Sequence, residues 1–241
     1  MARRPRGAAR TAVLSLILSS LLLPATALSE VTVHDAVTAT GREVMLRAQT
    51  GSGLFGSGGV LVEFFVDGRL VGKNLSGGDG VAFRSFVPKT ARLHKLRVQA
   101  QGGRAEGLLL AVKESAELVL IDVEGGLIEQ SLTMKPRPGS AVAVKKILRR
   151  YPVLYLGSGF FGTVAMKALL KERGFPEAPL IPGGSAVFEA LKEKRLRVRA
   201  VIGKPDLVQA ATGYTRRAFS FEATGDADAV EDWEEIVRKV K

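Results

Sequence analysis

The sequence predicts two domains: an all-β sandwich, then a three-layer α/β domain in which helices cover both faces of a parallel sheet. Three observations predict this fold class. Short apolar segments separated by turn residues run from Glu30 to about Lys113, which is the pattern of antiparallel strands. After Glu114 strand and helix patterns alternate, which is typical of a parallel sheet. A chain of 241 residues is long enough for two domains of this size.

Residues 1–27 have the order of a secretory signal peptide. Four arginines precede an apolar run at 12–23, and the small residues Ala25, Thr26 and Ala27 follow. We expect cleavage after Ala27 and export to a periplasmic or extracellular location. An uncleaved anchor is the alternative, although the run is shorter than the roughly 20 apolar residues of a membrane span. We expect no transmembrane span in the mature chain.

Composition limits the chemistry and the partners. The chain has no cysteine, which excludes disulfides, thiolate catalysis and cysteine zinc sites. Basic residues outnumber acidic ones even after the arginines of the leader are removed, which favours anionic partners. An anionic lipid, a phosphorylated small molecule or an envelope protein fits this surplus, whereas the export signal argues against nucleic acid. His34 and His94 sit apart in the β domain without metal-ligand companions, so we expect structural or surface roles for both.

The first domain is predicted at residues 28–114. The expected strands are Val44–Ala48, Val60–Val66, Val81–Val87 and Leu93–Ala100. The glycine-rich segment 51–59 lacks the Gly-Lys-Ser/Thr ending of a phosphate loop, so we expect a flexible connection there. Residues 58–102 resemble bacterial immunoglobulin-like repeats of surface and envelope proteins, which implies a sandwich fold and a spacer or binding role.

The second domain is predicted at residues 115–241. The expected strands are Glu117–Asp122, Pro152–Leu156, Val198–Ile202 and Ala218–Phe221, with helical patterns near 144–151, 165–170, 187–191, 207–211 and 230–240. Gly174 is suited to end the second helix. The two domains are expected to have independent cores joined at 113–116.

The strand that ends at Asp122 is the centre of the functional hypothesis. In parallel sheets, ligand chemistry lies at the carboxyl ends of strands, so Asp122 is the first candidate for a chemical role. Glu124 follows two residues later and is a candidate for acid/base work. Gly125 and Gly126 complete the abrupt end of the apolar run.

This segment resembles the first motif of the haloacid-dehalogenase (HAD) phosphatase superfamily, a Rossmannoid fold. Three further segments are similar to its phosphatidate phosphatase (lipin-type) group: Pro136–Gly139, Val153–Gly159 and Gly174–Leu180. The resemblance implies that Asp122 corresponds to the nucleophile that accepts a phosphoryl group and Glu124 to the general acid/base. The family has a second aspartate where this chain has Glu124.

The later motifs depart further from the family pattern. The residue implied to bind the phosphoryl group falls at Gly157, with Ser158 one position later. Lys192 is a candidate for the lysine that steadies phosphate charge, with Lys194 as the alternative. In the fourth motif Lys204 stands where the family has a metal-binding aspartate, so Asp122 and Asp206 are left as weak magnesium ligands. Lys204 is itself a candidate to contact an anionic ligand, with a plain surface charge or a salt bridge to Asp122 as the alternatives. We expect it to lie close to Asp122 and to lower the pKa of that carboxyl group.

Structural alternatives stand beside these roles. Asp122 can simply cap the turn after its strand, Glu124 can be a solvated loop carboxylate, and Ser158 can begin a helix. The basic clusters near 145–150 and 192–199 are either solvated faces or a patch for anionic lipid.

Three functions follow. The leading hypothesis is a non-catalytic, exported, envelope-associated protein that needs no cofactor and binds a phosphorylated or lipid ligand or a protein partner. The first alternative is a magnesium-dependent phosphatase with Asp122 as nucleophile. The second is an adhesion or scaffold protein that acts through the immunoglobulin-like domain.

Overall fold

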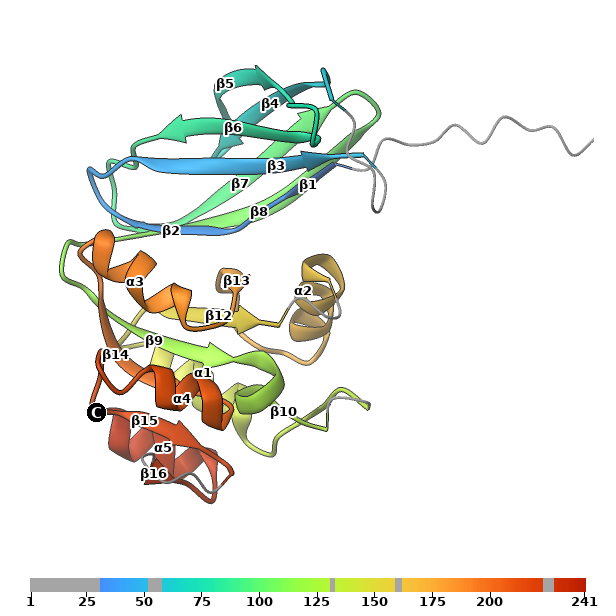
Figure 1. Cartoon of the computed structure of the whole chain (residues 1–241). Helices are drawn as coiled ribbons and strands as arrows, with labels where there is room; N and C mark the ends of the chain where they lie inside the picture. The colour runs from blue at the N-terminus through green and yellow to red at the C-terminus, as the bar shows by residue number, and fades with distance from the viewer. Residues whose placement is uncertain (1–30, 52–57, 131–132, 159–161, 223–227) are drawn as a thin grey trace, which may run out of the picture.

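The computed structural model describes residues 31–51, 58–130, 133–158, 162–222 and 228–241. The predicted signal peptide and most of the glycine-rich segment 51–59 lie outside these residues. Figure 1 shows a β-sandwich followed by an α/β region, which confirms the predicted fold class. No helix of the described chain is long and apolar enough to span a membrane.

The sandwich consists of two facing sheets. The three-stranded sheet has the order β1 (Val31–Val33), β3 (Val44–Thr50), β6 (Val81–Phe86). The five-stranded sheet has the order β2 (Ala36–Ala39), β8 (Gly103–Val112), β7 (Arg92–Ala100), β4 (Leu61–Val66), β5 (Arg69–Leu75). Neighbouring strands are antiparallel except β2 and β8. Alternate residues of both sheets point inward and form one core, including Leu46, Phe64, Val98 and Leu109.

Four strands of the sandwich match the predicted segments, whereas β1, β2, β5 and β8 were not predicted. Arg69–Leu75 was missed because it is mostly exposed and polar. A turn at Asp67-Gly68 joins β4 to β5, and both residues have positive φ, 50° and 80°. This conformation suits a tight hairpin turn, where glycine and aspartate are favoured.

The α/β region contains a six-stranded parallel sheet. Its order is β13 (Leu180–Pro182), β12 (Val153–Gly157), β9 (Glu117–Asp122), β14 (Arg197–Ile202), β15 (Ala218–Ser220), β16 (Asp228–Ala229). The helices are α1 (Ser140–Leu148), α2 (Thr163–Glu172), α3 (Ala186–Glu193), α4 (Pro205–Ala210) and α5 (Trp233–Val240). A short antiparallel pair, β10 (Ile128–Gln130) and β11 (Lys135–Pro136), follows β9. Gly174 has φ +74° just after α2, as its predicted role at the helix end requires.

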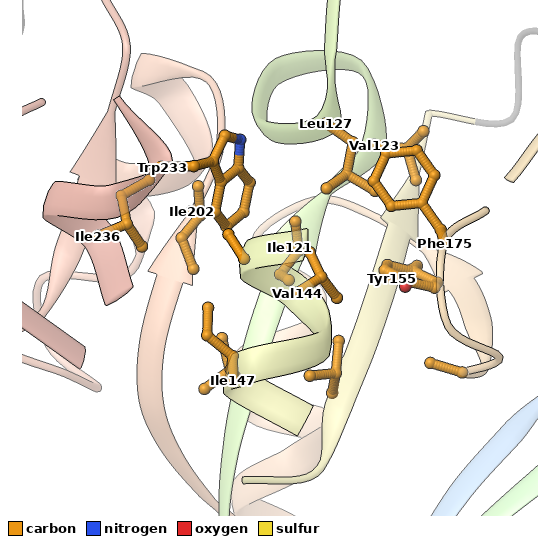
Figure 2. Packing of buried hydrophobic residues seen from close by; sticks show 14 of the residues in the cluster. Ile121, Val123, Leu127, Val144, Ile147, Tyr155, Phe175, Ile202, Trp233 and Ile236 are labelled. Carbon is orange, nitrogen blue, oxygen red and sulfur yellow. The ribbon is translucent and has the colours of Figure 1, made fainter. Parts of the chain in front are cut away.

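Helices cover both faces of this sheet. Alternate residues of β9 point to opposite faces, so Val119 and Ile121 pack with α1, α2 and α5, while Leu118 and Leu120 pack with α3 and α4. Figure 2 shows the first of these cores, with Trp233 beside Ile202 and Phe175 beside Tyr155. The three-layer arrangement places β9 in the middle of the sheet, so the residues after Asp122 emerge at its carboxyl edge.

The second core extends across the predicted domain boundary. Val37 and Ala39 of β2 and Leu110 and Val112 of β8 belong to the same buried cluster as Leu154 and other residues of the parallel sheet. Figure 1 shows β2 and β8 on the side of the sandwich that faces the α/β region. The prediction of two independent cores is therefore wrong, because the outer face of the sandwich is apolar where it meets the second region. The boundary at residue 114 itself stays a prediction.

Candidate functional site

Asp122 is the last residue of the central strand β9 and is only 8% exposed. The chain then forms a single π-helical turn, Val123–Leu127, which is buried throughout. The apolar residues of this turn, Val123 and Leu127, point into the core in Figure 2. The turn therefore holds the two carboxylates of the segment at a fixed place over the edge of the sheet.

Two glycines make this close packing feasible. A Cβ atom on Gly125 would lie 2.5 Å from both Asp122 Oδ2 and the amide nitrogen of Lys204, and one on Gly203 would lie 2.7 Å from Asp122 Cβ. Any larger residue at either position would collide with backbone or with the carboxylate. Gly126 uses its carbonyl to accept a hydrogen bond from Trp233 Nε1 at 3.2 Å, which links the turn to α5.

Lys204 lies next to Asp122, as predicted. Its backbone N–H donates to Asp122 Oδ2 at 3.3 Å, while its side chain is exposed. The two residues meet because β9 and β14 are adjacent parallel strands whose carboxyl ends share one edge. The loop at Gly203 turns the chain back over Asp122 before α4 begins.

The pKa of Asp122 departs from the expectation. Burial is the largest influence and raises the pKa, Lys204 lowers it through its amide and its charge, and Glu124 raises it; together they raise the pKa from 3.8 to about 6. Lys204 lowers the pKa of Asp122 as predicted, but the loss of hydration outweighs its effect, so the net shift is upward. A carboxyl group that titrates near neutrality in a buried position is typical of functional sites.

Glu124 is buried, and Ser158 donates hydrogen bonds to its carboxylate. Its carboxylate accepts a hydrogen bond from the Ser158 hydroxyl at 2.7 Å and others from the Ser158 amide at 3.1 and 3.3 Å. The interpretation of Glu124 as a solvated loop residue is wrong, since it is 7% exposed. The interpretation of Ser158 as a helix start is also wrong, because α2 begins at Thr163 with Gly162 as its N-cap. Ser158 instead positions Glu124.

A small pocket of about 100 Å³ opens beside Glu124. Its lining includes Gly157, Ser158, Thr163 and Gly183. Gly157 uses its carbonyl to accept a hydrogen bond from the Gly183 amide at 2.9 Å. The pocket is large enough for a few water molecules or a very small anion, but not for a lipid head group with its chains.

Two further residues of the predicted site, Lys192 and Asp206, are exposed. Lys192 lies in the last turn of α3, is 70% exposed and pairs with Glu189 at 3.7 Å. Asp206 lies in the first turn of α4 and is exposed. Among the residues that the structure describes, no three His, Cys, Asp or Glu side chains gather in a way that would hold a metal ion. The donor set at the sheet edge is thus the pair Asp122 and Glu124.

Asp35 is a buried polar residue that sequence reasoning missed. Its carboxylate, fully buried, accepts hydrogen bonds from the Leu108 amide at 2.7 Å and the Leu180 amide at 2.8 Å, and pairs with Lys167 Nζ at 2.5 Å. It therefore joins β8 of the sandwich to β13 and α2 of the α/β region. Its partners are 73 to 145 positions away, so no local pattern could have identified it.

Comparisons with known proteins add little to this geometry. The sequence matches no protein-family model and no curated protein sequence. Similar solved structures include the CARDB domain of the PF1109 protein from Pyrococcus furiosus, at 13% identity over 36% of this chain and 97% of that chain, with a TM-score of 0.29. The fibronectin(III)-like modules of CbhA from Clostridium thermocellum have 19% identity over 35% and 97%, with a TM-score of 0.25. The D0-D1 domain of intimin has 12% identity over 38% and 56%, with a TM-score of 0.27. The fold class therefore rests on strand order and pairing.

Proposed function

We propose that this is an exported, envelope-associated protein that binds a ligand or a protein partner and does not transfer phosphoryl groups. Its α/β region is a HAD-like domain that has kept the fold and lost most of the metal site. The ligand is phosphorylated or lipid, in keeping with the basic surplus of the chain. The leader at residues 1–27 supports a periplasmic or extracellular location.

One observation carries the non-catalytic proposal: the amide and hydroxyl of Ser158 both donate to Glu124. By resemblance to the HAD superfamily, hydrogen-bond donors at this strand end bind the transferring phosphoryl group. Here an internal carboxylate occupies those donors. An incoming phosphate would meet the negative charge of Glu124 in a buried site, where repulsion between like charges is strong.

The fourth motif supports the same proposal. Lys204 presents its amide to Asp122 Oδ2, at the position where the family has an acidic metal ligand. A lysine contributes positive charge, but it cannot bind magnesium, which prefers oxygen ligands. Attack of a carboxylate on a phosphate requires that the repulsion between the two anions be neutralised. The exposed side chain of Lys204 is poorly suited to do this alone.

The test is a phosphatase assay on the mature chain. A generic phosphate ester and a phosphatidate are incubated with the wild type, Asp122→Asn and Lys204→Asp, each with and without magnesium. We expect no magnesium-stimulated turnover by the wild type and no difference in Asp122→Asn. Magnesium-dependent melting shifts in Lys204→Asp would report a restored metal site.

The second candidate is a working phosphatase with Asp122 as nucleophile. The observation that favours it is the buried carboxyl of Asp122, with a pKa raised to about 6, at the carboxyl end of the central strand. Robust magnesium-stimulated turnover by the wild type, lost in Asp122→Asn, would establish this function and overturn the first.

A further inference from the structure

A cleft of about 770 Å³ lies between the sandwich and the α/β region, away from Asp122. Residues of β7 and β8 form one wall, and α2 with the segment 175–178 forms the other. Figure 1 shows α2 below the sandwich. The volume lies within the range of about 300 to 1,000 Å³ that is usual for small-molecule sites, which occur often at domain interfaces.

The lining of the cleft combines an apolar surface with basic side chains. The apolar residues include Leu108, Leu170, Phe175 and Ala178. The charged residues are Lys95, Arg97, Lys167, Lys171, Glu106 and Glu177. A ligand that fits this surface has a hydrocarbon part and a negative charge.

Two of the basic residues already have partners. Lys95 pairs with Glu177 at 2.5 Å, and Lys167 pairs with the buried Asp35. Both pairs cross from the sandwich to the α/β region and so connect the two walls of the cleft. They leave Arg97 and Lys171 as the cations available to a ligand.

Arg97 has unused hydrogen-bonding capacity. Its Nε atom is buried and has no hydrogen-bond partner in the described chain, and its guanidinium lies 4.3 Å from the centre of the Phe65 ring. Glu106 is its neighbour in register on β8, yet the two side chains form no ion pair within the described residues. Because Nε is itself covered by protein, an anion in the cleft would bind the terminal nitrogens of the guanidinium, to which the described residues give no hydrogen bond or ion pair. Lys171 likewise has no ion pair within the described part of the chain.

We propose that this cleft binds a free, single-chain amphiphile with one carboxylate head group. The chain lies against the apolar wall around Leu170 and Phe175, and the carboxylate binds the guanidinium of Arg97 and the ammonium of Lys171. A free amphiphile is favoured over a lipid within a bilayer because the apolar surface is recessed between two parts of the chain. The proposal rests on the ligand-binding function proposed above and not on the Asp122 site.

Titration calorimetry with dodecanoate on the mature chain tests the proposal. Acetate, which lacks the chain, and dodecanol, which lacks the charge, are the matched ligands. We expect saturable one-to-one binding of dodecanoate and little or none of the other two. Arg97→Gln and Lys171→Gln should each weaken dodecanoate binding about tenfold, the effect of losing one charge-assisted hydrogen bond. Arg69→Gln, on the exposed strand β5 of the same sandwich, should leave it unchanged.

Three results would overturn the proposal: no binding of dodecanoate, binding that both cleft variants retain, or binding only to anionic vesicles. Lys171 is exposed, so Lys171→Gln is expected to fold and keeps the test valid if Arg97→Gln does not. Phosphatase activity together with dodecanoate binding that depends on the cleft residues would refute the non-catalytic function but support the proposed ligand site in the cleft. If neither phosphatase activity nor dodecanoate binding is found, the proposed ligand of the cleft is refuted and the non-catalytic function is not.

Discussion

The Asp35 carboxylate lies 2.5 Å from Lys167 Nζ, a contact between residues 132 positions apart that links the sandwich to helix α2. Asp35 also accepts two backbone N–H hydrogen bonds, so three groups stabilise its carboxylate. The pair combines an interior carboxylate with a lysine side chain that is 25% exposed. Removing this ion pair should therefore lower the stability of both the sandwich and the α/β region.

Asp35→Asn should lower the free energy of unfolding by roughly 3 kcal/mol, since hydrogen bonds to a buried charge are lost and Lys167 loses its partner. Urea denaturation at neutral pH measures this. Lys73→Gln removes the exposed pair with Glu63 and should cost less than about 1 kcal/mol. Equal losses in the two variants would contradict the role given to Asp35.

The stability of the wild type relative to Asp122→Asn should depend on pH. The carboxyl of Asp122 has a folded-state pKa of about 6, raised from 3.8, so its favourable contribution is complete below pH 3.8 and is lost as the pH rises through 6. The difference in unfolding free energy between the two proteins should shift by roughly 2 kcal/mol against the wild type between pH 4 and pH 7. Denaturation curves at several pH values measure it, and a flat difference would show that the pKa is not raised.

Gly125→Ala should destabilise the protein by about 1 to 3 kcal/mol, because the added methyl group collides with Asp122 and with the amide of Lys204. Gly213→Ala is the matched control: it has open space around the added methyl group, so its effect should stay within about 0.5 kcal/mol. Thermal unfolding of both variants tests this. A tolerated Gly125→Ala would mean that the turn after β9 is looser than described.

Leu110→Ala, in the sandwich, should destabilise the α/β region by about 2 to 4 kcal/mol because its side chain belongs to the core shared with β9 and β12. Trp233, the only tryptophan, lies in α5 and reports unfolding of the α/β region by its fluorescence. Leu61→Ala, at a position 49% exposed in the same sandwich, serves as the control and should change little. An unchanged fluorescence transition in Leu110→Ala would support separate cores after all.

Much of the second region could be predicted from the sequence because its signals are local. The continuous apolar run of 117–121 and the helical spacing of 144–148 each depend on neighbours within a few positions. The proximity of Lys204 to Asp122 was predictable too, since both end adjacent parallel strands. The strand Arg69–Leu75 was missed because its stability comes from pairing with β4 rather than from its own apolar pattern.

The electrostatic details could not be predicted in the same way. The raised pKa of Asp122 depends on how completely the turn at 123–127 excludes water, and the role of Ser158 depends on the position of Glu124. The role of Asp35 could not be predicted from the sequence because its three partners come from distant parts of the chain. Burial and long-range contacts of this kind emerge only when the elements are assembled.

The apolar surface shared by β2, β8 and the parallel sheet has an evolutionary consequence. A recombination event that joined this sandwich to a different partner would leave Leu110 and Val112 facing water or an ill-fitting neighbour. The two parts are thus not freely exchangeable modules, even though the chain passes between them over a few residues. In relatives of this protein, substitutions at Val112 should be accompanied by compensating changes at Leu154 or Phe188, a dependence between positions that a modular architecture would not impose.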